Sequence, residues 1–122
     1  MTKFKVLGIS WMGIGTEHYQ ATSRLLRDVF GLPVAAEVED QAIFDVGFGQ
    51  QVELFGRPGP GRDRNSPPAF AFEVDDFNAA VAALIAAKVE LVGEPGEWNG
   101  HCWQYFRLPD GYLLSVKVSP RP

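Results

Sequence analysis

Apolar side chains in the first half of the chain predict one helix among four short strands. Residues 4–12 (FKVLGISWM) are mostly apolar and include β-branched residues, which favours a strand. Thr16 is a favourable N-cap residue, and Gly31 followed by Pro33 ends the predicted helix. The face that this helix is expected to bury consists of Tyr19, Thr22, Leu25, Leu26 and Val29. The other strands are predicted at residues 34–39, 41–48 and 50–55, and their close spacing favours antiparallel pairing.

The second half of the chain repeats this order after a break. Residues 57–68 (RPGPGRDRNSPP) contain Gly and Pro but no hydrophobic period, so they predict a linker. A strand is predicted at residues 69–74, and Asp75 or Asp76 is expected to cap the next helix. The apolar stripe of that helix is Phe77, Val81, Leu84 and Ile85. The remaining segments are predicted as strands at residues 89–92, 101–108 and 112–118, a loop at 94–100 and a turn at 109–111.

The repeated order of elements predicts an α+β fold built from two βαβββ modules. The modules are residues 1–56 and 69–122, and together they are expected to form a single domain of 122 residues. One helix can cover only one face of a four-stranded sheet. The two modules are therefore expected to form a curved mixed sheet with a concave cleft on its other face.

Composition and charge narrow the classes of partner. Hydrophobic residues make up 46% of the chain and charged residues 21%, which is enough apolar material for a packed core. The net charge of −4 argues against nucleic acid, whose backbone is bound by clustered Lys and Arg. No apolar run is long enough to span a bilayer, so no membrane partner is expected. Cys102 is the single cysteine and cannot close an intrachain disulfide, which favours a reducing, cytoplasmic location.

Three short motifs follow one another along the chain. They are TSRLLRDVFGLPV at residues 22–34, Val52-Glu53-Leu54, and the LPDGY turn at residues 108–112. In this order they resemble the vicinal oxygen chelate superfamily, in which the first motif looks like the first helix. That superfamily includes glyoxalase I, extradiol dioxygenases, methylmalonyl-CoA epimerase and bleomycin resistance proteins. The resemblance covers essentially the whole chain and implies a glyoxalase/bleomycin-resistance-like fold. It does not imply one reaction, because members of this fold carry out several.

The resemblance also implies where a metal ion would be held. Metal-using members place one ligand, typically His or Glu, on each of four strands. The corresponding positions here are Trp11, Glu53, Ala69 and Ser115, of which only Glu53 offers a carboxylate. We therefore predict no metal ion and no other cofactor. A substitute site made of His18, Glu53 and His101 is a weaker alternative, because these residues are not expected to converge.

Without a metal ion, the lining of the cleft predicts the ligand. Side chains alternate along strands, so Glu53 shares a face with Gln51 and Phe55. Aromatic side chains stack on planar or cationic molecules, and one carboxylate can orient them. We expect a small-molecule ligand to contact Trp11, Gln51, Glu53, Phe55, Trp98, Trp103 and Ser115. Glu53 itself is interpreted either as a general base or as an orienting carboxylate bonded to Ser115 or Lys117, and the second role is preferred.

The sequence leaves open whether the chain is an enzyme. A metal-free binding protein is the preferred hypothesis. The first alternative is a metal-dependent or Glu-based lyase, isomerase or dioxygenase of the same superfamily. The second is an interaction module whose cleft is filled by side chains. Cys102 is interpreted as a small buried residue rather than a nucleophile, since His101 is expected to point to the other side of the strand. By analogy with single-domain members of this fold, a homodimer is expected.

Overall fold

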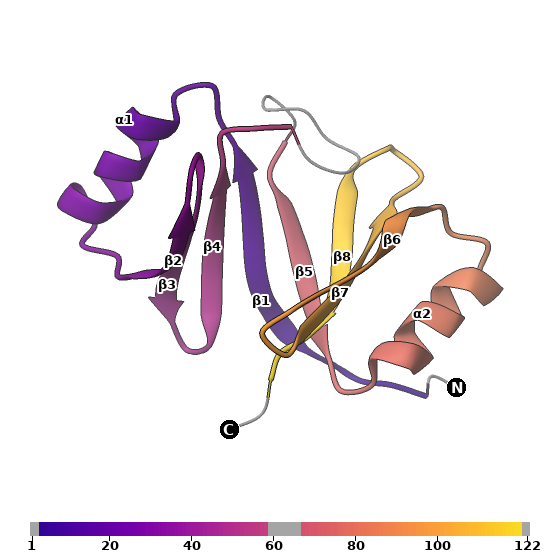
Figure 1. Ribbon diagram of the computed structural model, residues 1–122. Coiled ribbons are helices and arrows are strands. Elements are labelled where there is room, and N and C mark those ends of the chain that lie inside the picture. Colours follow the sequence, from indigo (N-terminus) through magenta and orange to yellow (C-terminus); the bar gives the residue numbers. More distant parts are fainter. Residues whose placement is uncertain (1–2, 59–66, 121–122) are drawn as a thin grey trace. The chain divides into compact units, whose positions relative to one another are not determined.

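The computed structural model describes residues 3–58 and 67–120, which divide into two compact units (Figure 1). One comprises residues 11–68 and is called the Glu53 unit, and the other comprises residues 1–10 and 69–122 and is called the Glu73 unit. Strand β1 (Val6–Gly15) contributes to both. The order of elements is strand, helix and three strands, twice, so the two predicted βαβββ modules and the α+β class are confirmed.

The Glu53 unit contains four strands in the order β2-β3-β4-β1. The second half of β1 pairs in parallel with β4 (Gln50–Phe55), which pairs antiparallel with β3 (Gln41–Gly47). Strand β3 in turn pairs antiparallel with β2 (Val34–Val38) at the edge. The core of this unit lies on the face that the helix covers, where Tyr19, Ala42, Phe44 and Leu54 are buried.

The first helix differs from its prediction. Helix α1 (Tyr19–Arg24) begins after His18, and Thr16 instead accepts a hydrogen bond from the His18 amide (2.9 Å). From Leu25 the chain continues as a π-helical segment, η1 (Leu25–Val29), with more residues per turn than an α-helix. Leu25 and Val29, predicted to be buried, are 46% and 71% exposed, so their predicted burial was wrong.

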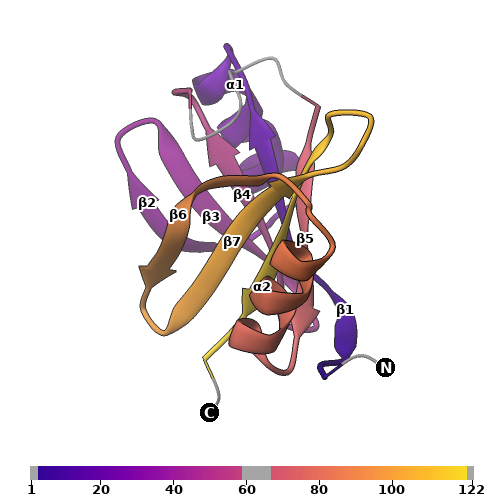
Figure 2. The ribbon, with the colours of Figure 1, turned by 90° about the vertical axis from the view of Figure 1, so that its right-hand side faces the viewer.

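The Glu73 unit places strand β5 (Ala69–Val74) between the first half of β1 and β8 (Leu113–Val118). Strand β8 pairs antiparallel with β7 (His101–Arg107), which pairs with the edge strand β6 (Leu91–Trp98). Helix α2 (Phe77–Ala86) lies against β7 and β8 (Figure 2). The core between this helix and the strands buries Val74, Ala80, Phe106, Leu114 and Val116.

Three predictions for the second module are refined. Asp76 is the residue that caps α2, because its Oδ1 accepts from the Ala79 amide at 3.0 Å. Phe77, Val81 and Leu84 pack into the core, whereas Ile85 is 59% exposed, so its predicted burial was wrong. The predicted loop at residues 94–100 is mostly strand β6. Pro95 is tolerated there because β6 is an edge strand with a bulge between Val92 and Gly96. No helix in the described part of the chain is long and apolar enough to cross a membrane.

Candidate functional site

Trp11 and Glu53 meet on neighbouring strands of the Glu53 unit. In the parallel pairing of β1 with β4, Gly13 lies opposite Glu53 and Trp11 lies two residues earlier. The indole Nε1 of Trp11 donates a hydrogen bond to Oε1 of Glu53 at 3.0 Å. The Gln41 amide on β3 donates to the other carboxylate oxygen, Oε2, at 2.6 Å. Both oxygens of Glu53 therefore accept hydrogen bonds from N–H groups of its own unit.

The backbone of Gly13 makes room for the Trp11 ring. A Cβ atom at residue 13 would lie 2.3 Å from Cη2 of Trp11, closer than real side chains approach. The ring is only 8% exposed, and it meets Phe55 edge-on, with 6.4 Å between ring centroids and 69° between planes. Glycine at position 13 is thus required for the indole to lie flat along β1 and reach the carboxylate.

Glu53 lies on the sheet face that α1 does not cover. Leu54 points into the core beneath α1, so Glu53, Gln51 and Phe55 point the other way, as the alternation along β4 predicts. All three are partly exposed. The Gln51 amide donates to Asp45 Oδ1 on β3 at 3.1 Å. This face therefore combines two aromatic rings, two amides and two carboxylates.

The other predicted ligand contacts belong to the Glu73 unit. Trp103 on β7 lies opposite Lys117 on β8, and its ring lies across Gly96, where a Cβ atom would be 2.2 Å from the indole. Trp98 is 46% exposed at the end of β6 and stacks on His101, with 6.2 Å between ring centroids. Ser115 is buried, and its hydroxyl donates to the Val116 carbonyl at 3.1 Å.

The expected partners of Glu53 are corrected by these contacts. The sequence suggested Ser115 or Lys117, but Glu53 is bound by Trp11 and Gln41. Ser115 turns its hydroxyl to a backbone carbonyl, and Lys117 pairs with a different acid, Glu73. The reason is strand order: β8 lies next to β5, so the acid of β5 is the one beside Lys117.

A buried polar cluster around Glu73 was missed by the sequence analysis. Glu73 accepts hydrogen bonds from the Ser10 hydroxyl (2.7 Å) and from the Ser119 amide and hydroxyl (both 2.8 Å). The ammonium of Lys117 lies 3.9 Å from Glu73 Oε1. Burial lowers the pKa of Lys117, and the charge of Glu73 acts in the opposite direction. A signal was present in the sequence, since a lysine and an acid each stand within an apolar strand.

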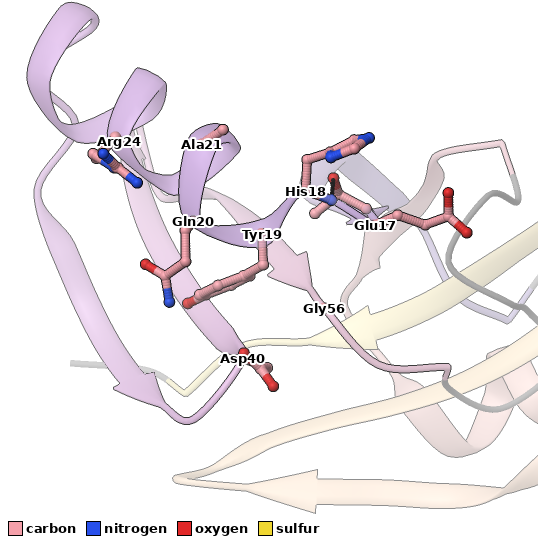
Figure 3. A pocket seen from close by; sticks show the side chains of 9 residues that line it. Glu17, His18, Tyr19, Gln20, Ala21, Arg24, Asp40 and Gly56 are labelled. Atoms are coloured by element: carbon pink, nitrogen blue, oxygen red, sulfur yellow. Dashed lines mark hydrogen bonds between the residues drawn. The ribbon is translucent and has the colours of Figure 1, made fainter.

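A pocket of about 460 Å³ opens at the start of α1 in the Glu53 unit (Figure 3). Figure 3 shows the Tyr19 ring beneath the start of α1 beside the Gln20 side chain, and its hydroxyl donates to Glu37 Oε2 at 3.5 Å. Burial and the neighbouring Glu37 raise the pKa of the Tyr19 hydroxyl. None of the residues predicted to contact a ligand lines this pocket. Its lining is Thr16, Glu17, His18, Tyr19, Gln20, Ala21, Arg24, Asp40 and Gly56.

The family model of the Glyoxalase/Bleomycin resistance protein/Dioxygenase superfamily matches residues 8–116. This match covers both βαβββ modules. The chain belongs to this superfamily.

Solved structures of superfamily type share its fold. The Mn(II)-bound glyoxalase from Novosphingobium aromaticivorans is 23% identical, with a TM-score of 0.73 over 98% of this chain, and the match spans 42% of that protein. Methylmalonyl-CoA epimerase from Mycobacterium tuberculosis is 20% identical, with a TM-score of 0.72 over 100% of this chain and 93% of that one. A superfamily member from Vibrio splendidus 12B01 is 20% identical, with a TM-score of 0.63 over 90% of this chain and 96% of its own. No curated protein matches.

The residues that the resemblance assigns to metal-ligand positions do not fit a metal ion. Trp11 offers only an N–H donor, Ala69 has no polar atom, and the Ser115 hydroxyl is bonded to the backbone. The one carboxylate, Glu53, accepts hydrogen bonds on both oxygens. Among residues 3–58 and 67–120, no group of three or more His, Cys, Asp or Glu side chains could hold a metal ion. His18 and His101 belong to different units, so the alternative site with Glu53 is not formed within either one.

Proposed function

We propose that this superfamily member binds a planar, cationic small molecule without a metal ion. The observation that carries the proposal is the hydrogen bond from the Trp11 indole to Glu53. In metal-using members, the resemblance implies that the corresponding carboxylate binds the ion, whereas here it accepts from a side-chain N–H group. The carboxylate therefore has partners that keep it in place in the absence of any ion. Both oxygens already accept hydrogen bonds, which favours an orienting role for Glu53 over a role as general base.

The chemistry around Glu53 supports a flat cation as the ligand. Each carboxylate oxygen can accept more than one hydrogen bond, so a ligand N–H group can be added to those of Trp11 and Gln41. Phe55 is partly exposed beside the carboxylate and offers an aromatic surface. A cation that is also planar gains both the charge of Glu53 and contact with the ring.

The proposal is tested by calorimetric titration with benzamidine and with benzamide, its neutral counterpart. We expect benzamidine to bind more tightly than benzamide, in the presence of EDTA as in its absence. The Glu53→Gln variant should lose at least about tenfold in affinity for benzamidine, equivalent to about 1.4 kcal/mol. Glu94→Gln, a matched change at an exposed acid, should bind as the wild type does. Equal binding of both compounds, or unchanged binding by Glu53→Gln, would overturn the proposal.

We also propose that the chain acts as a cytoplasmic homodimer. Support for assembly comes from exposed apolar side chains on the edge strand of the Glu53 unit, where Val34 and Val38 are 39% and 67% exposed. The single cysteine is a free thiol, which suits a reducing compartment. Light scattering on the purified protein should give twice the mass of the 122-residue chain, and a monomer would contradict this proposal.

A further inference from the structure

The sheet face of the Glu73 unit opposite α2 carries a second group of polar side chains. Residues 101 and 103 of β7 and residue 117 of β8 point to this face, because Phe106, Leu114 and Val116 occupy the face toward the helix. Trp103 lies directly opposite Lys117 in the strand pairing. His101 comes two residues before Trp103, so its ring lies on the same face.

Lys117 has unused hydrogen-bonding capacity. Lys117 is only 6% exposed. Its ammonium donates one hydrogen bond, to the Ser119 hydroxyl at 2.6 Å. Glu73 neutralises its charge at 3.9 Å, a distance beyond a hydrogen bond. An ammonium has three N–H donors, so two of them have no acceptor among the residues that the structure describes.

His101 has an unpaired atom in the same cluster. Its Nδ1 is buried and has no hydrogen-bond partner in the described part of the chain. His101 and Lys117 lie on the same face of neighbouring paired strands, because Trp103, two residues after His101, is opposite Lys117. Burial lowers the pKa of His101, and the charge of Lys117 acts in the same direction. A buried polar atom without a partner is costly, so a group that satisfies both residues would be stabilised there.

We propose that His101 and Lys117 bind a hydroxyl group on a ring-shaped ligand. A hydroxyl oxygen accepts from the ammonium of Lys117, and it can donate to or accept from Nδ1, whichever tautomer the imidazole adopts. A carboxylate would add a second negative charge beside Glu73, and a ligand ammonium would meet the charge of Lys117. The proposal rests on the proposed small-molecule function and concerns a site formed within the Glu73 unit.

Two tryptophans provide surfaces for the ring of such a ligand. Trp98 stacks on His101 at the end of the β6–β7 hairpin and is 46% exposed, so it can shift without disturbing the core. Trp103 is held across Gly96 of the neighbouring strand β6, which fixes its ring over the β6–β7 pair. Aromatic surfaces next to a few directed polar groups are typical of small-molecule sites.

Saturation-transfer NMR with phenol, and with toluene as the ring without a hydroxyl, tests this site. We expect phenol to bind at least about tenfold more tightly than toluene, the equivalent of about 1.4 kcal/mol. His101→Phe keeps an aromatic partner for Trp98 and should abolish that preference, whereas His18→Phe, at the other histidine, should keep it. Equal affinities for the two compounds, or an unchanged preference in His101→Phe, would overturn the proposal.

A second variant tests the site without leaving a buried charge unpaired, so that loss of binding is not confused with a folding defect. Replacing Lys117 alone would leave Glu73 without its counter-charge, so the double variant Glu73→Gln/Lys117→Met removes both charges together. It should bind phenol no better than toluene, and a retained preference would count against the site. The two proposals fail separately, because benzamidine binding is expected to depend on Glu53 and the phenol preference on His101.

Discussion

The indole of Trp11 donates a hydrogen bond to the carboxylate of Glu53, 42 residues away in the sequence. The resemblance to metal-using members assigns both positions to metal ligands, but here one side chain is an N–H donor and the other is its acceptor.

Replacing Trp11 by Phe should destabilise the protein by about 1–3 kcal/mol, because Glu53 loses a hydrogen bond to a charged acceptor and the ring loses packing. Urea denaturation measures the change in the free energy of unfolding. Trp98→Phe, at a half-exposed ring, should change it by less than about 0.5 kcal/mol. Equal effects of the two substitutions would contradict the role given to the Trp11 contact.

Gly13→Ala should cost about 1–3 kcal/mol of stability, because the added Cβ overlaps the Trp11 ring and displaces it. Near-ultraviolet circular dichroism should report the altered environment of the indole. In the double variant Gly13→Ala/Trp11→Phe the overlapping atoms are gone, so its cost should be less than the sum of the single costs. Additive costs would show that the overlap does not determine the effect.

Glu73→Gln should destabilise the protein by about 3–5 kcal/mol, because the buried ammonium of Lys117 loses its counter-charge. The side chains of Lys117 and Glu73 are 8% and 18% exposed, so solvent screens this pair weakly. The matched change Glu90→Gln breaks an exposed ion pair with Arg107 and should cost less than about 1 kcal/mol. Chemical denaturation of both variants makes the comparison, and similar losses would refute the importance of the buried pair.

Stability should fall as the pH drops through and below 6.5, the usual pKa of histidine. Burial lowers the pKa of His101 in the folded state, so the unfolded state binds more protons in this range. The contribution of the neutral imidazole is therefore complete above the unfolded pKa and is lost toward the lower folded one. Denaturation curves at pH 7.5 and pH 5.0 measure the loss, which should be smaller in His101→Phe than in His18→Phe. Identical pH dependence in these two variants would contradict the assignment to His101.

The Glu53 face could be anticipated from the sequence because it depends on local regularities. Alternation along one strand puts Gln51, Glu53 and Phe55 together, and the spacing of the family motifs points to Trp11. The hydrogen bond itself could not be anticipated, since it requires the parallel register that sets Gly13 opposite Glu53. The absence of a Cβ atom at Gly13 is also decisive, and it has no periodic signature in the sequence.

The Glu73 cluster depends on strand order, which local patterns do not contain. Ser10 and Ser119 are 63 and 46 residues from Glu73, and they meet it because β5 lies between β1 and β8. The π-helical segment after Arg24 was missed for a related reason, since its apolar residues fit an α-helical period in the sequence. In both cases tertiary pairing or a local change of helical period decided the outcome.

The metal content of the protein tests the central claim most directly. The wild-type protein and the Glu53→Gln variant are purified without chelator, and the metal bound per chain is measured by elemental mass spectrometry. The contacts of Glu53 with Trp11 and Gln41 predict that both carry far less than one transition-metal ion per chain. One equivalent of manganese, zinc, nickel or iron in the wild type, lost in Glu53→Gln, would contradict the account.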